Sequence, residues 1–65
     1  MSYEEFRERV RRVLREIGKP VLWSDIRRQA RLHQKFPNNR WVHRMERDIG
    51  LVRQRIKGRV MWSLK

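Results

Sequence analysis

Apolar residues at the start of the chain recur at helical spacing and make one stripe along residues 3–17: Phe6, Val10, Val13, Leu14 and Ile17. Ser2 and Glu5 form a capping-box signature at the beginning of this helix. Glutamates four residues ahead of arginines give favourable pairs along its polar side. Gly18 ends the helix in a left-handed turn, and Pro20 prevents it from resuming.

The next segment predicts a short extended stretch over residues 20–23, followed by a second helix over about 25–32. Ser24 is the expected N-cap of that helix, and Asp25 suits its positive end. The inward positions are Ile26, Ala30 and Leu32, while the other side carries Arg27, Arg28 and Arg31.

Residues 33–37 lack periodicity and predict a turn, in which Phe36 is expected to join the core. Asn38 is a natural N-cap after Pro37, so a third helix is expected over about 39–48. Gly50 terminates it.

From residue 51 the apolar period changes from 3.6 to 2, which predicts a β-hairpin with strands over about 51–56 and 60–64. We expect one face to hold Val52, Gln54, Val60, Trp62 and Leu64, and the other to hold Arg53, Arg55, Arg59 and Met61. A three-residue loop over 56–58 produces these faces, because it pairs Gln54 with Val60 and Val52 with Trp62. A two-residue Lys57–Gly58 loop would mix the faces, so the three-residue loop is preferred.

The expected fold is therefore mostly α with a small β-hairpin, as one domain over residues 1–65.

The chain has no cysteine, so neither a disulfide framework nor a Cys-based zinc site is available. No apolar run approaches the roughly 20 residues of a membrane span, and residues 1–10 lack a signal-peptide core. We expect a protein of the cytoplasm, nucleoid or nucleus that is neither secreted nor bound to a membrane.

Charge separates the chain into two parts. Its net charge is +11. Residues 1–18 hold five arginines and four glutamates, whereas residues 19–65 hold thirteen Lys or Arg and three acids. Such a segregated excess implies a polyanionic partner.

The third helix combines an apolar side with a basic one. At about 100° per residue, Trp41, Val42, Met45 and Ile49 gather on one side. The opposite side is predicted to contact DNA bases through Asn39, Arg40, His43, Arg44 and Arg47. Arg can bridge O6 and N7 of guanine, and Asn can bridge N6 and N7 of adenine, in the major groove.

The order helix, extended segment, helix, turn, basic helix, hairpin resembles the winged helix-turn-helix DNA-binding family over the whole chain. The regular capping and pairing of the first helix is typical of designed helices, so the chain also resembles a computationally designed DNA-binding protein on that scaffold. The turn at 33–37 is longer than in a tight helix-turn-helix. The resemblance implies a hairpin "wing" that touches phosphates or a neighbouring minor groove.

The residues expected at phosphates come from three regions. Helix two and its approach supply Lys19, Trp23, Ser24, Arg27 and Arg28; the start of helix three supplies Asn38; and the wing supplies Arg53, Arg55, Lys57 and Arg59. Arg53 and Arg55 have a second interpretation, in which their stems cover the domain's own surface. Ser24 is equally well explained as a simple cap. Trp41 and Trp62 are expected in the core.

The expected function is sequence-specific binding of double-stranded DNA by a monomer, with no chemistry. His33 and His43 have no carboxylate partners at metal-ligand spacing, and no phosphate-binding glycine loop or nucleophile elbow is present. We therefore expect no enzyme, metal, cofactor or small-molecule substrate. Two alternatives stay open: binding of RNA or an unusual duplex, and a protein-interaction module.

Overall fold

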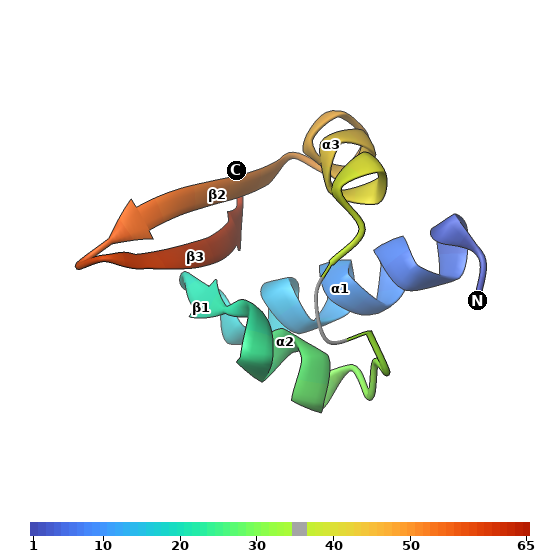
Figure 1. Cartoon of the computed structure of the whole chain (residues 1–65), viewed down its shortest axis with the longest axis horizontal. Coiled ribbons are helices and arrows are strands. Elements are labelled where there is room, and N and C mark those ends of the chain that lie inside the picture. Colours follow the sequence, from blue (N-terminus) through green and yellow to red (C-terminus); the bar gives the residue numbers. More distant parts are fainter. Residues whose placement is uncertain (35–36) are drawn as a thin grey trace.

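The first helix, α1, spans Tyr3–Ile17 in the computed structural model, which describes residues 1–34 and 37–65 (Figure 1). Ser2 Oγ accepts a hydrogen bond from the Glu5 N–H at 3.1 Å, which confirms the predicted cap. Gly18 closes the helix with a φ of 71°, and its N–H donates to the Leu14 carbonyl at 3.0 Å. Both ends thus follow from local sequence.

The second helix, α2, spans Trp23–Gln29 and begins earlier than predicted. Its N-cap is Leu22, which makes no side-chain capping bond, so the prediction that Ser24 caps this helix is wrong. The reason lies in strand β1 (Val21–Leu22), which pairs with Trp62 and Met61 and holds the chain extended up to the first helical residue.

The end of α2 also differs, since the helix stops at Gln29 and not at Leu32. Arg31 adopts a left-handed φ of 55°. This turn lets the Leu32 N–H donate to the Arg27 carbonyl at 2.9 Å. It also brings the Leu32 side chain into the core, where it is buried.

The third helix, α3, spans Asn39–Asp48, as predicted. Asn38 Oδ1 accepts hydrogen bonds from the N–H groups of Arg40 at 2.9 Å and Trp41 at 3.3 Å, so the predicted cap is confirmed. The expected core position of Phe36 lies outside the described residues.

The predicted hairpin is present as β2 (Leu51–Ile56) and β3 (Arg59–Leu64), but its turn has two residues and not three. Lys57 and Gly58 have φ values of 52° and 79°, and positive φ at both positions matches the right-handed strand twist. Arg53 consequently pairs with Trp62, and Gln54 with Met61.

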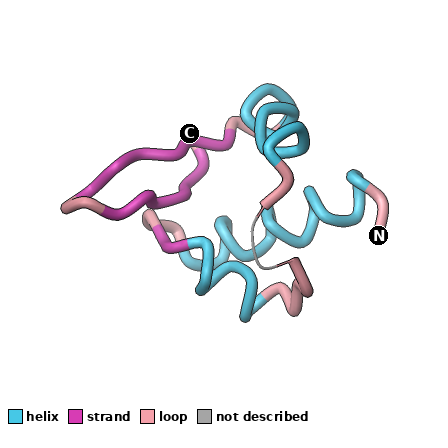
Figure 2. Tube along the Cα trace, in the orientation of Figure 1, coloured by secondary structure: helices cyan, strands magenta, loops and turns pink. Residues whose placement is uncertain are grey.

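This register overturns the predicted faces of the hairpin. Directly paired residues share a face, so Arg53 and Arg55 lie on the side of Trp62 and Val60, and Val52 and Gln54 lie on the other. The hairpin reaches away from the helices (Figure 2). Near its tip both faces are exposed, so mixing Arg55 with Val60 carries no burial penalty.

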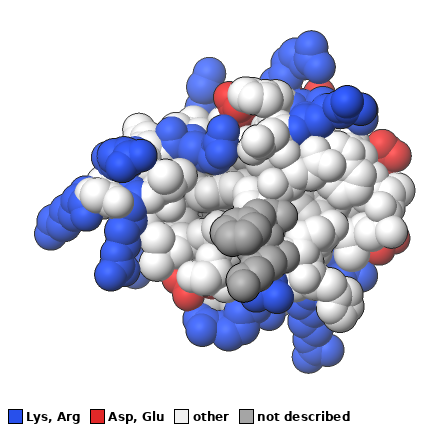
Figure 3. All heavy atoms as spheres, in the orientation of Figure 1, with Lys and Arg blue, Asp and Glu red and all other residues white. Residues whose placement is uncertain are grey.

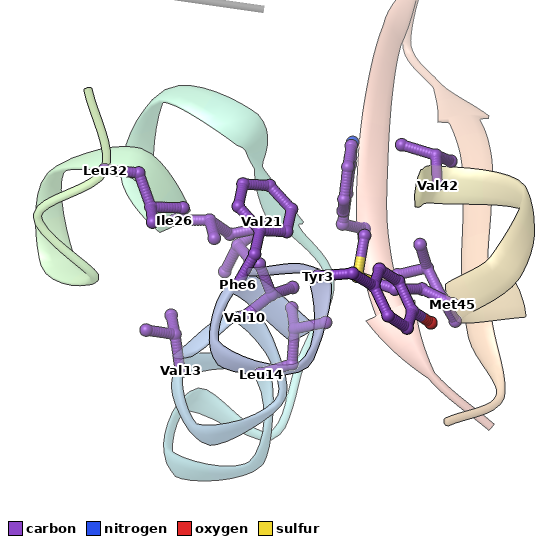
Figure 4. Packing of buried hydrophobic residues seen from close by; sticks show 12 residues of the cluster. Tyr3, Phe6, Val10, Val13, Leu14, Val21, Ile26, Leu32, Val42 and Met45 are labelled. Carbon is purple, nitrogen blue, oxygen red and sulfur yellow. The ribbon is translucent and has the colours of Figure 1, made fainter. Parts of the chain in front are cut away.

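The three strands form one antiparallel sheet in the order β1-β3-β2. The protein therefore has three helices and a small sheet among its described residues, with about half of the chain helical. Figure 4 shows side chains of α1 at the centre of the core, with Ile26 and Leu32 on one side and Val42 and Met45 on the other.

Aromatic rings continue this core from α1 to the sheet. Trp41 packs against Phe6 with ring centroids 5.1 Å apart, and Trp23 lies between Phe6 and Trp62 at 6.1 and 5.0 Å. Trp62 is buried and Trp41 half-buried, which confirms the predicted core positions of both.

Candidate nucleic-acid interface

The outer side of α3 carries polar and basic side chains, all exposed. Val42 and Met45 are fully buried and fix the inner side of this helix. Because a helix turns about 100° per residue, the side opposite to them carries Arg40, His43, Arg44 and Arg47, with Asn39 at its edge. All five residues predicted to contact bases are therefore exposed. Asn39, Arg40, His43 and Arg47 form the outer arc of α3, whereas the side chain of Arg44 turns onto Tyr3.

Glu46 borders this arc and pairs with His43, so the expectation that this histidine has no carboxylate partner is wrong. Its Oε1 lies 3.1 Å from His43 Nδ1, and the two side chains are 42% and 72% exposed. Exposed pairs of this kind contribute only about 0–1 kcal/mol. The imidazole is therefore held near Glu46 weakly enough to be reoriented by a partner.

Arg44, the fifth residue predicted to contact bases, projects from the exposed side of α3, but its side chain turns toward α1. Its guanidinium carbon is 3.8 Å from the centroid of the Tyr3 ring. Arg7 approaches the same ring from α1, at 5.5 Å. Arg44 is thus occupied by a cation–π contact, which sequence periodicity did not reveal because Tyr3 is distant in the chain.

Tyr3 is in turn anchored to the end of α3. Its hydroxyl donates to Asp48 Oδ2 at 2.7 Å. Burial of the ring raises the pKa of the Tyr3 hydroxyl above its ordinary value, and the hydrogen bond to Asp48 raises it further. The pair joins the first turn of α1 to the last residue of α3.

The hairpin contributes four cations and no carboxylate over residues 51–64. Lys57 and Arg59 lie at its tip, where Figure 3 shows Lys and Arg atoms gathered at the end farthest from α1. Arg53 lies closer to the body, with its guanidinium carbon 5.8 Å from the Trp62 ring centroid. Its stem therefore covers part of the core, while Arg55 is exposed beyond it.

The predicted phosphate contacts around α2 are arranged differently from expectation. Ser24 and Lys19 are exposed, but Ser24 is inside the first helical turn. Arg28 pairs with Asp25 at 2.9 Å. Trp23 is half-buried within the aromatic core, so its ring serves packing. Asn38 Oδ1 is used by its capping bonds.

No family model, curated protein or solved structure matches this chain. In the described part of the chain, no three side chains of His, Asp or Glu come together as a metal site. Within the same residues, every helix is too short or too polar to cross a membrane.

Proposed function

We propose that this protein is a winged helix-turn-helix domain that binds double-stranded DNA sequence-specifically, with α3 in the major groove and the hairpin as its wing. The exposed arc of Asn39, Arg40, His43 and Arg47 on α3 carries the proposal. The element order and the sheet order β1-β3-β2 support it, because they join the short strand before α2 to the hairpin that follows α3.

The arc has the chemistry that major-groove edges require. Arginine donates two parallel hydrogen bonds to guanine O6 and N7, and asparagine both donates to and accepts from adenine. Residues near the start of the helix make the base contacts in most helix-turn-helix proteins, which favours Asn39, Arg40 and His43. Arg47 lies one turn beyond His43 on the same arc and extends it.

Arg44 joins the interface by leaving Tyr3. A cation–π contact at an exposed site contributes about 0.5–1 kcal/mol, whereas a bidentate guanine contact discriminates by about 1–3 kcal/mol. The exchange is favourable where guanine is within reach.

The wing holds the backbone of the duplex. Lys57 and Arg59 contact phosphates at the tip, and Arg55 follows along the strand. Arg53 mainly shields Trp62 with its stem, which favours the second interpretation of that residue. Because phosphates are the same in every sequence, these cations add affinity without selecting bases.

The alternative functions fit the surface less well. The large apolar side chains exposed in the described residues are Met1, Ile56 and Val60, and the last two lie on opposite faces of the hairpin. A docking patch for a protein partner needs them together. A-form RNA buries its base edges in a deep, narrow major groove, where the side chains of the outer arc of α3 cannot reach them.

Titration of one labelled sequence as a DNA duplex and as an RNA duplex tests the proposal. We expect the DNA form to bind at least tenfold more tightly. Arg47→Ala should reduce this preference, and Arg15→Ala, which removes the same charge from the exposed side of α1, should keep it. Equal affinity for both duplexes would mean charge-driven binding and would refute the proposal.

A further inference from the structure

A surface pocket of about 470 Å³ lies beside α2 and the segment that follows it. It is lined by Ser24, Arg27, Arg28, Arg31, Leu32 and His33. Three guanidinium groups, an imidazole and a hydroxyl thus surround one hollow, and no carboxylate belongs to the described lining. Asp25, the nearest acid in sequence, is paired with Arg28 at 2.9 Å.

Arg27 supplies a buried donor that lacks an acceptor. Its Nε is buried and has no hydrogen-bond partner among the described residues. Its Nη2 donates to the His33 carbonyl at 3.5 Å. Buried N–H groups are nearly always paired. Arg27 lines this cationic pocket, and its unpaired donor can be satisfied by an acceptor from outside once the side chain moves.

Arg31 occupies a backbone position that favours glycine. Its φ of 55° closes α2, with its N–H donating to the Arg28 carbonyl at 3.3 Å. At Gly18 and Gly50, which follow α1 and α3, the same left-handed conformation is adopted by glycine. The Arg31 side chain is exposed and makes no hydrogen bond or ion pair with the described residues. An arginine at this position therefore costs stability without a hydrogen bond or ion pair from its side chain to the described residues.

A parallel exists at the hairpin tip. Lys57 is the other described non-glycine residue with positive φ, and it too is cationic and exposed. Strained backbone positions concentrate at functional sites. In this chain, both such positions present a positive charge to solvent where glycine would be easier to accommodate.

We infer that this pocket binds one phosphate group, with Arg27 Nε as its inner donor and Arg28 and Arg31 as the groups that neutralise it. The phosphate belongs to the backbone of the duplex, and to that extent the inference rests on the proposed function. Arg31 and His33 thereby enter the interface, which extends beyond α2 into the segment that follows it. The site replaces the N-cap site expected at Ser24.

Arg31→Gly separates a role in phosphate binding from a structural role, because it should raise the stability of the protein and lower its affinity for DNA. The variant should unfold at a higher denaturant concentration than the wild type, since glycine relieves the left-handed strain. Its affinity for a duplex should fall about fivefold, and the slope of log affinity against log salt should decrease in magnitude by about one. Arg15→Gln is the matched control for loss of one positive charge outside the pocket.

A more stable Arg31→Gly variant that binds DNA as well as Arg15→Gln does would overturn the inference and leave the proposed function intact. A second readout is the NMR signal of the Arg27 Nε–H, recorded with duplex DNA and with inorganic phosphate alone. A shift with both is expected. A shift with inorganic phosphate in a protein that binds no duplex would refute the proposed function and retain the pocket as a phosphate site. No shift with either would refute the pocket.

Discussion

The guanidinium carbon of Arg44 lies 3.8 Å from the centroid of the Tyr3 ring, so a residue of α3 rests on the first turn of α1. Tyr3 also donates its hydroxyl hydrogen to Asp48 at 2.7 Å. Two contacts therefore join one aromatic side chain to two positions on α3 one turn apart. The basic helix is thus joined to a residue far away in the sequence.

Arg44 and Arg47 should respond differently to truncation. We expect Arg44→Ala and Arg47→Ala each to weaken binding of a preferred duplex by about 1–3 kcal/mol. Only Arg44→Ala should also lower the free energy of unfolding, by about 0.5–1 kcal/mol, because it alone loses a cation–π contact. Urea unfolding and anisotropy titrations measure the two effects. Equal stability of the two variants would contradict the role given to Tyr3.

Tyr3 should make stability depend on alkaline pH. Its pKa is raised in the folded protein, so the unfolded chain releases the hydroxyl proton first. The contribution is complete below the ordinary value of 10.0 and declines as the pH rises above it. The wild type should therefore lose stability above this pH more steeply than Tyr3→Phe. Parallel pH profiles for the two proteins would show that the hydroxyl is not responsible.

The capping residues give a direct check on where the helices begin. Ser24→Ala should change the free energy of unfolding by less than about 0.5 kcal/mol, since Ser24 caps nothing. Asn38→Ala should cost about 1 kcal/mol, because two N–H groups at the start of α3 lose their acceptor. Thermal or urea unfolding of both variants suffices. A larger cost at Ser24 than at Asn38 would reverse the assignment.

Lys57→Asn tests the tip of the hairpin. Asparagine tolerates a left-handed conformation better than lysine and favours a two-residue turn before Gly58. We expect stability to rise by some tenths of a kcal/mol, roughly the scale of turn substitutions. Affinity should fall for all duplex sequences alike, because a phosphate contact is lost. A loss confined to one sequence would instead make Lys57 a base reader.

Features set by neighbouring residues were predictable from the sequence. Ser2, Gly18 and Asn38 act within one helical turn, so the start of α1, its end and the start of α3 were predicted correctly. The start of α2 was not, because it is determined by the pairing of Val21 with Trp62. That contact spans most of the chain and leaves no local signal.

The prediction of the hairpin register was wrong for a related reason. The alternation of apolar and polar residues reports burial, and near the tip neither face is buried. Arg53 adds to the ambiguity, since it lies on the side of buried Trp62 with its charged end in solvent. The position of Arg44 likewise depends on Tyr3, and the pocket beside α2 depends on the left-handed turn at Arg31.

Selection of bound duplexes from a randomised library tests the central claim most directly. If α3 reads base edges through its outer arc, the selected duplexes should share a motif of about half a helical turn, the length one recognition helix covers. Arg40→Ala or Arg47→Ala should then relax the preference at one position of that motif. A flat sequence profile from the wild-type protein would contradict base readout and leave only binding driven by charge.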